Sequence, residues 1–87
     1  MGTTQSSTSN SYYLIYSLDG CPFCIKAEKL LKNNSLLYKV IRITQEEKQK
    51  YKEYLRVKTF PQIYYVKNDE LTPIGGCSDL EKYLTTF

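Results

Sequence analysis

The sequence predicts an α/β domain whose elements follow the order β-α-β-α-β-β-α, with a four-stranded mixed sheet flanked by helices. An apolar run at residues 12–16 leads into Cys-Pro-Phe-Cys at residues 21–24, which is typical of a strand that turns into a helix. Two further runs, residues 38–43 and 62–66, are rich in the Val, Ile and Tyr that favour strands. Apolar residues at helical spacing lie between these runs and end the chain, and 87 residues suffice for one small domain.

The first three elements follow from the hydrophobic pattern. Residues 12–17 predict a buried strand, and residues 21–33 predict a helix. One face of this helix is apolar: Phe23, Ala27, Leu30 and Leu31. Residues 38–43 predict a second strand, and we expect it to run parallel to the first because a helix joins the two by a right-handed crossover.

A capping box, Thr-Gln-Glu-Glu at residues 44–47, predicts the start of a second helix. We expect this helix to end near Arg56. Its spacing turns three side chains toward the core: Tyr51, Tyr54 and Leu55.

A hairpin and a third helix complete the prediction. Residues 62–66 and 71–74 form the hairpin, and Pro73 confines the last strand to an edge of the sheet because proline has no N–H to donate. A second capping box at residues 78–81 predicts the final helix, with Ser78 as a candidate N-cap.

Composition excludes several classes of function. The formal net charge is only +3 and the lysines are dispersed, so the sequence does not indicate nucleic-acid binding. No segment has the apolar length needed to cross a bilayer, and residues 1–11 lack the apolar stretch of a signal peptide. We expect residues 1–11 to be a disordered tail or a cloning remnant and residues 12–87 to form one domain. We also expect the protein to be a monomer that resides in the cytoplasm and makes no membrane contact.

The two cysteines at the start of the first helix are the candidate reactive groups. A thiol there faces unpaired backbone N–H groups and the positive end of the helix dipole. Both stabilise a thiolate, which is the reactive form of cysteine. Cys21 is therefore the predicted nucleophile, and Cys24, one turn later, is placed to resolve a mixed disulfide formed on it.

Three other interpretations of this pair are weaker. Structural zinc usually takes four Cys or His ligands, and the chain has three cysteines and no histidine, so we expect no metal site. A structural disulfide across four residues would remove little entropy from the unfolded chain. Two functionless buried thiols would leave Pro22 unexplained, whereas proline suits the first position of a helix.

Thr59-Phe60-Pro61 precedes the third strand and is a second candidate constellation. A cis bond between Phe60 and Pro61 would turn the Phe60 N–H and C=O toward the dithiol, where they could pair with a peptide-like substrate. The alternative is an ordinary trans proline at the start of a strand. The combination with the Cys-Pro-Phe-Cys motif favours the cis bond.

Residues 75–79, Gly-Gly-Cys-Ser-Asp, form the third constellation. The glycines allow a ligand to approach the backbone, and the helix that follows offers free N–H groups to a carboxylate. Asp79 could hold an ammonium group, so the segment suits the head of an α-amino acid; the alternative is a glycine turn before a capped helix. Cys77 is either a small packing residue or an oxidisable thiol.

Together, residues 21–24, 59–61 and 75–79 resemble the dithiol glutaredoxins, which usually read Cys-Pro-Tyr-Cys, Thr-Val-Pro and Gly-Gly-x-x-Asp. The resemblance covers about residues 12–83. It implies a thioredoxin-like fold, no bound cofactor, and glutathione as cosubstrate. The glutathione-binding residues implied by the resemblance are Phe23, Lys58, Thr59, Phe60, Pro61, Gly76, Cys77, Ser78 and Asp79.

The implied activity is glutathione-dependent reduction of protein–glutathione mixed disulfides and of protein disulfides. The clients would be glutathionylated or disulfide-containing proteins, and ribonucleotide reductase is a reasonable example. One rival is a carrier of a glutathione-ligated [2Fe–2S] cluster, although Pro22 resembles the catalytic variants. The other rival is a thioredoxin-type electron donor, which the segment at residues 75–79 disfavours.

The chain departs from this pattern at two positions. Leu18 stands where many relatives carry a basic residue, so one anchor for the glycine carboxylate of glutathione is missing and we expect weaker binding. Phe60 replaces the usual Val, which would reshape the binding groove.

Overall fold

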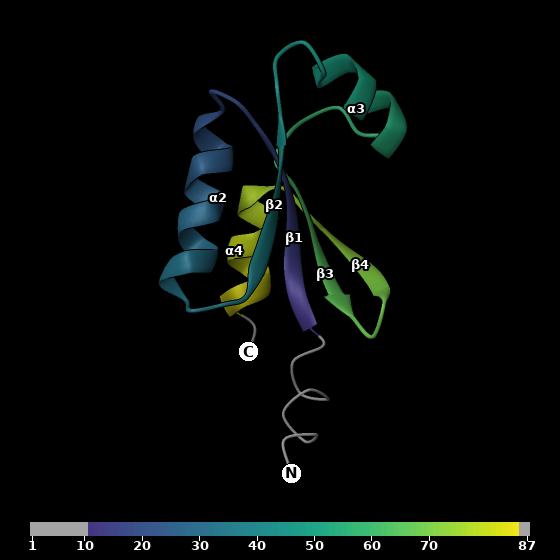
Figure 1. Cartoon of the computed structure of the whole chain (residues 1–87). Coiled ribbons are helices and arrows are strands. Elements are labelled where there is room, and N and C mark those ends of the chain that lie inside the picture. Colours follow the sequence, from purple (N-terminus) through teal and green to yellow (C-terminus); the bar gives the residue numbers. More distant parts are fainter. Residues whose placement is uncertain (1–10, 86–87) are drawn as a thin grey trace.

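The computed structural model describes residues 11–85 and confirms the predicted order of elements (Figure 1). The strands and helices are β1 (Ser11–Leu18), α2 (Pro22–Asn33), β2 (Tyr38–Ile43), α3 (Lys48–Leu55), β3 (Gln62–Lys67), β4 (Glu70–Gly75) and α4 (Cys77–Thr85). Residues 1–10 of the predicted tail lie outside the described range, and Ser11 already belongs to β1.

The sheet has the strand order β2-β1-β3-β4. β1 pairs with β2 in parallel, as predicted, and the other two pairings are antiparallel. Ile15 on β1 faces Val40 on one side and Ile63 on the other. β4 is an edge strand, which confirms the prediction made from Pro73.

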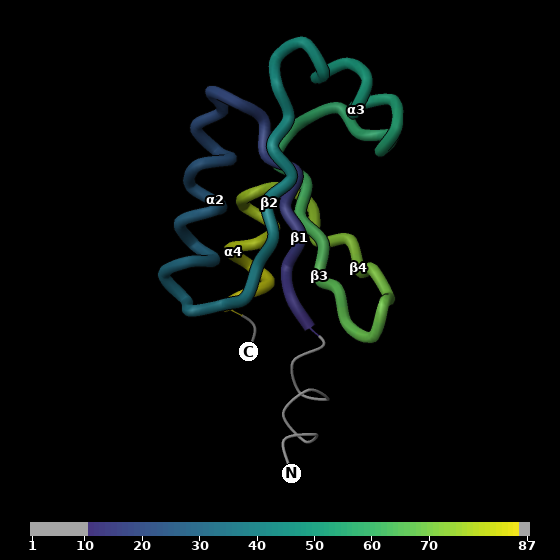
Figure 2. Tube along the Cα trace, in the orientation of Figure 1, coloured from purple at the N-terminus to yellow at the C-terminus, as the bar shows by residue number. Residues whose placement is uncertain are grey.

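The two faces of the sheet are covered unequally. α2 and α4 lie together on one face (Figure 1), whereas α3 stands away from the sheet near the end of β2 (Figure 2). The main core fills the space between the sheet and the helix pair, and its buried members are Tyr13, Ile15, Ala27, Leu31, Ile63, Cys77 and Leu80. Truncating a buried side chain such as Ile15 would cost about 2–5 kcal/mol.

A second, smaller cluster lies beneath the first turn of α2. It consists of Leu18, Cys24, Ile43 and Phe60. Tyr51 and Leu55 of α3 pack against it, which is how α3 is attached to the domain. Leu18 thus packs beside Cys24 in this cluster.

Two predicted core residues are in fact exposed. Tyr54 is 75% exposed because α3 approaches the domain only through the side that carries Tyr51 and Leu55. Phe23 is 63% exposed because the first turn of α2 extends beyond the sheet, so the buried stripe of α2 consists of Cys24, Ala27 and Leu31.

The two capping boxes also differ from the prediction. Thr44 and Glu47 exchange reciprocal hydrogen bonds of 3.2 Å, but these close the turn before α3, which begins at Lys48. α4 begins at Cys77, so Ser78 lies inside the helix and is not its N-cap. The carboxylate of Asp79 instead accepts a hydrogen bond from the Gly76 N–H, which satisfies one free donor at the start of this helix.

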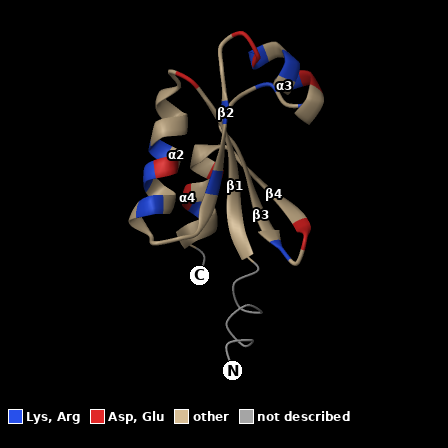
Figure 3. Cartoon of the chain, in the orientation of Figure 1, with Lys and Arg blue, Asp and Glu red and all other residues tan. Residues whose placement is uncertain are grey.

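Charged residues of both signs share α2 and α3 (Figure 3). The lysines and arginines are spread over several elements, as the sequence suggested. Among residues 11–85 there is no helix with the length and apolar character that crossing a membrane requires.

Candidate active site

Cys21 is the N-cap of α2 and follows the carboxyl end of β1. Its backbone is extended (φ −92°, ψ 115°), and its sulfur accepts a hydrogen bond of 3.4 Å from the Cys24 N–H. Pro22 occupies the first turn, which contains no acidic side chain. This half-buried sulfur therefore lies at the N-terminus of α2, within hydrogen-bond distance of a backbone N–H.

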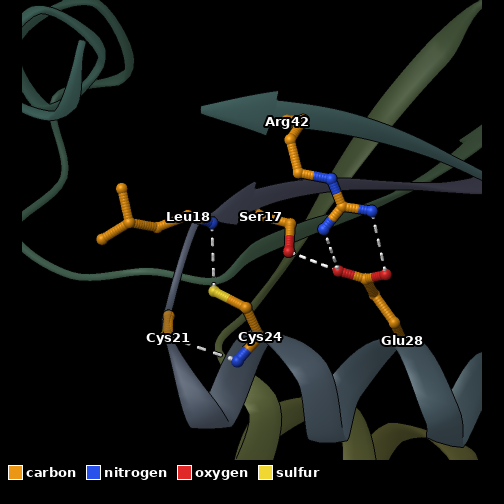
Figure 4. Close-up of polar contacts among 6 residues, drawn as sticks. All are labelled: Ser17, Leu18, Cys21, Cys24, Glu28 and Arg42. Atoms are coloured by element: carbon orange, nitrogen blue, oxygen red, sulfur yellow. Dashed lines mark hydrogen bonds and ion pairs between the residues drawn. The ribbon is translucent and has the colours of Figure 1, made fainter. Parts of the chain in front are cut away.

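Cys24 lies one turn further and is fully buried. Its sulfur accepts a hydrogen bond of 3.3 Å from the Leu18 N–H (Figure 4). Burial, reinforced by a hydrogen bond with Cys21, raises the pKa of Cys24 to about 12, and the Leu18 amide and the Ser17 hydroxyl oppose this shift. Cys24 is therefore a neutral thiol at physiological pH, and all three cysteines are free in this structure.

The Phe60–Pro61 peptide bond is cis, as the sequence predicted. The Phe60 carbonyl oxygen lies 3.7 Å from the Cys21 sulfur, so its backbone borders the nucleophile. The Phe60 side chain is buried in the second cluster. The extra volume of Phe relative to Val thus fills the core below the dithiol.

A groove of about 320 Å³ lies between the start of α2, the Phe60–Pro61 bond and the start of α4. Most of the predicted glutathione residues line it, namely Phe23, Thr59, Phe60, Pro61, Gly76, Cys77 and Ser78. A larger hollow of about 490 Å³ lies at the other end of β1 near Tyr12, Lys39 and Asn68. Cys21 and Cys24 line neither hollow, but the Cys21 sulfur contacts the carbonyl of Phe60, which belongs to the wall of the smaller groove.

Lys58 and Asp79 are not part of the groove wall. Lys58 is exposed, and Asp79 lies beside the groove, where its Oδ2 is 3.0 Å from the Gly76 nitrogen. Gly75 has a φ of +119°, and a Cβ at this position would collide with the Asp79 carboxylate. The observed position of the Asp79 carboxylate therefore requires a residue without a side chain at Gly75.

Lys26 and Glu81 line the groove but were not identified from the sequence. Their side chains form an ion pair of 3.1 Å that joins α2 to α4 along one wall. The partners lie on two helices whose rotation about their axes the sequence does not specify. The sequence offered one signal for the position of Lys26. The hydrophobic face of α2 points to the core and so places Lys26 on the side toward solvent.

Cys77 is 6% exposed and contributes to both the groove wall and the main core. Burial raises its pKa, and the negative charge of Glu81 acts in the same direction. This environment favours the neutral thiol and the packing role.

A chain of polar side chains lies behind Cys24 (Figure 4). Ser17 on β1 is fully buried and donates a short hydrogen bond to Oε2 of Glu28 on α2. Arg42 on β2 contacts both carboxylate oxygens of Glu28, at 3.1 and 3.4 Å. Sequence reasoning missed this chain, and its only local sign is a serine inside an otherwise apolar run.

Comparisons with known proteins agree with this geometry. The family model described as Glutaredoxin matches residues 13–71. The chain is 41% identical to glutaredoxin 1 of Rickettsia prowazekii over 71 residues, which cover 77% of this chain and 70% of that protein.

The fold is similar to solved glutaredoxins. The crystal structure of glutaredoxin 1 from Francisella tularensis has a TM-score of 0.75 at 22% identity, covering 87% of this chain and 94% of that one. A buckwheat glutaredoxin has a TM-score of 0.64 at 20% identity, covering 97% of this chain and 78% of that one. The predicted thioredoxin-like fold is confirmed, and the chain belongs to the glutaredoxin family of thiol–disulfide oxidoreductases.

Proposed function

We propose that this protein uses glutathione to reduce protein–glutathione mixed disulfides and protein disulfides, with Cys21 as nucleophile and Cys24 as resolving thiol. One observation carries the proposal. The Cys21 sulfur caps a helix and lies 3.7 Å from the carbonyl of Phe60, and Phe60 lines a groove whose wall also includes the start of α4. A peptide thiol bound in this groove would bring its sulfur to Cys21.

Glutathione fits the chemistry of the groove. Its cysteinyl backbone can pair with the Phe60 backbone, as an added strand would. Its γ-glutamyl carboxylate can bind the N–H groups at the start of α4, and its ammonium group can bind the free oxygen of Asp79. Lys58, next to Thr59, is the candidate cation for the glycine carboxylate. The buckwheat glutaredoxin of similar fold is a complex with glutathione, which supports this class of ligand.

The reaction consists of balanced thiol–disulfide exchanges. The Cys21 thiolate attacks the glutathione sulfur of a glutathionylated protein, so that the Cys21–glutathione disulfide forms and the protein thiolate leaves and takes a proton. A second glutathione thiolate attacks the same glutathione sulfur, releasing oxidised glutathione and the Cys21 thiolate. On a protein disulfide, Cys24 instead attacks the Cys21 sulfur and releases the client as a thiol.

In this proposal the protein acts in the cytoplasm as a monomer and without a bound cofactor. Its clients are proteins with accessible disulfides or glutathione adducts, a class that includes ribonucleotide reductase. Client choice depends on the surface around the groove, where the exposed Phe23 is the largest apolar contact.

The experiment is reduction of the mixed disulfide between glutathione and 2-mercaptoethanol, coupled to glutathione reductase and NADPH. We expect saturable turnover that depends on glutathione. Coupling the same protein to thioredoxin reductase is the control, and we expect little turnover there. Turnover with thioredoxin reductase alone would contradict the proposal and support a thioredoxin-type electron donor.

A further inference from the structure

The wall of the groove beside the dithiol contains two charged side chains, and they are paired with each other. Among residues 11–85, Lys26 is the one cation and Glu81 the one anion that line this groove. Their ion pair of 3.1 Å leaves both accessible, with 57% of the Lys26 side chain and 41% of the Glu81 side chain exposed. A ligand that fills the groove therefore contacts this pair or lies close to it.

Helical spacing places both charges on faces that border the groove. Lys26 follows Phe23, another groove residue, by three positions on α2. Glu81 follows Cys77, also a groove residue, by four positions on α4. Burial raises the pKa of Cys77, the charge of Glu81 raises it further, and the charge of Lys26 lowers it, so both charges lie near the start of α4. The proposed function places the γ-glutamyl end of glutathione there.

Glutathione carries a net negative charge into this wall. At neutral pH it has two carboxylates and one ammonium group, whereas the charges of Lys26 and Glu81 cancel each other. A bound carboxylate is attracted by the Lys26 ammonium and repelled by the Glu81 carboxylate. Lys58 is exposed and lies outside the wall, so Lys26 is the one cation that the described wall offers to the γ-glutamyl carboxylate.

We propose that Lys26 binds the γ-glutamyl carboxylate of glutathione and leaves Glu81 to do so. The inference rests on the proposed function, since it concerns how the same groove holds the tripeptide. Lysine has a flexible four-carbon stem, so its ammonium can change partner without a movement of α2. Lys26 is then a substrate-binding residue, and Glu81 is a positioning residue that holds the lysine at the wall before the ligand binds.

Competition between the two carboxylates gives the pair a role in specificity. A small anion that contacts Lys26 alone gains little over Glu81 and does not displace it. The γ-glutamyl carboxylate also accepts hydrogen bonds from the N–H groups at the start of α4, which makes the exchange favourable. The two partners therefore act in opposite directions, because Lys26 favours the binding of glutathione and Glu81 opposes it.

The test is the transfer of glutathione to Cys21 from its mixed disulfide with 2-mercaptoethanol. Protein with Cys24→Ser stops at this adduct, which is quantified by mass spectrometry after an acid quench and gives a second-order rate constant. The comparison substrate is the same mixed disulfide made with γ-aminobutyryl-cysteinyl-glycine, which is glutathione without the γ-glutamyl carboxylate. Only the first substrate has the group that Lys26 binds.

All variants are made in the Cys24→Ser background. With the glutathione substrate, we expect Lys26→Gln to lower the rate constant about three- to fivefold and Glu81→Gln to raise it about two- to threefold, as for a partly exposed ion pair. Adding Glu81→Gln to Lys26→Gln restores part of the loss, because the unpaired carboxylate no longer repels the ligand. With the comparison substrate, both effects disappear. Lys29→Gln, exposed on the same helix and outside the wall, is the matched control and changes neither rate constant.

Three results overturn the inference. The first is a wild-type rate constant in Lys26→Gln with the glutathione substrate. The second is an equal loss in Lys26→Gln with both substrates, because the lysine then acts on Cys21 or on the fold. The third is a loss in Glu81→Gln that matches the loss in Lys26→Gln, because that indicates an ion pair that only joins the two helices.

A binding measurement separates failure of this inference from failure of the proposed function. S-methylglutathione cannot undergo exchange, so an NMR titration measures its affinity for the groove without chemistry. We expect Lys26→Gln to weaken this binding by the same factor as it lowers the rate constant, and an unchanged affinity overturns the inference. If no adduct forms on Cys21 in the Cys24→Ser protein, the proposed function is refuted, and the titration still decides whether Lys26 binds the tripeptide.

Discussion

The two sulfurs of the dithiol lie one helical turn apart in opposite surroundings. On the groove side, Cys21 caps α2, is half-buried and borders the Phe60 carbonyl. On the core side, Cys24 is fully buried against Leu18 and has Ser17 and Glu28 behind it. The same helix start therefore exposes one sulfur to substrates and keeps the other protonated until it is needed.

The difference follows from where each residue stands in α2. Cys21 precedes the helix, so its side chain points toward the free N–H groups. Cys24 lies three residues before Ala27 and seven before Leu31, which places it on the buried stripe. A Cys-x-x-Cys spacing at a helix start thus separates a nucleophile from a resolving thiol by geometry alone.

The largest expected effect comes from the groove side. Cys21→Ser removes the nucleophile, so we expect reduction of glutathione mixed disulfides and of protein disulfides to fall by about a thousandfold or more. Both activities are measured with glutathione and glutathione reductase. Wild-type turnover in this variant would show that another sulfur is the nucleophile.

Cys24→Ser should separate the two activities. The glutathione reaction needs only Cys21, so we expect it to stay within about threefold of wild type, whereas reduction of a protein disulfide should be lost. Insulin reduction, followed by turbidity, reports the second activity. If the variant still reduces insulin with glutathione at the wild-type rate, Cys24 is not the resolving thiol.

The core side should control stability at alkaline pH. The pKa of Cys24 is raised in the folded protein, so between about pH 9 and pH 12 the unfolded chain loses this proton while the folded protein keeps it. The free energy of unfolding should therefore fall with rising pH, at up to about 1.4 kcal/mol per pH unit from this group. Urea denaturation of wild type and Cys24→Ala measures it, and we expect a shallower fall in the variant. Equal slopes would contradict the assigned shift.

The smallest expected effect concerns the ammonium group of glutathione. Asp79→Asn keeps an acceptor for the Gly76 N–H but removes the charge, so we expect the KM for glutathione to rise about three- to tenfold with little loss of stability. Asp79→Ala should raise the KM similarly and also cost about 1 kcal/mol of stability, because the N–H loses its partner. Asp69→Asn, in the β3–β4 turn, is the matched control. An unchanged KM in Asp79→Asn would remove the ammonium-binding role.

Most of the groove side could be predicted from the sequence because its parts are local. Proline or glycine fixes the backbone within a few residues in each of three segments: the Cys-Pro-Phe-Cys turn, the Phe60–Pro61 bond and residues 75–79. The order of elements along the chain, the parallel β1–β2 pair and the β3–β4 hairpin followed from the hydrophobic runs and the connections between them.

The core side could not be predicted because its contacts join separate elements. Ser17, Glu28 and Arg42 come from β1, α2 and β2, and meet only when the helix packs on the sheet. The Lys26–Glu81 pair was missed for the same reason. The prediction that Phe23 and Tyr54 face the core was wrong. Helical spacing predicts which side chains share a face, but it does not predict how far each helix overlaps the sheet.

The most direct test of the contrast between the two sulfurs is alkylation of the reduced protein with iodoacetamide across pH, with the modified cysteines identified by mass spectrometry. The account predicts that Cys21 is alkylated at neutral pH, while Cys24 remains unmodified until the pH exceeds about 9 and the fold weakens. Alkylation of Cys24 at neutral pH as fast as that of Cys21 would contradict it.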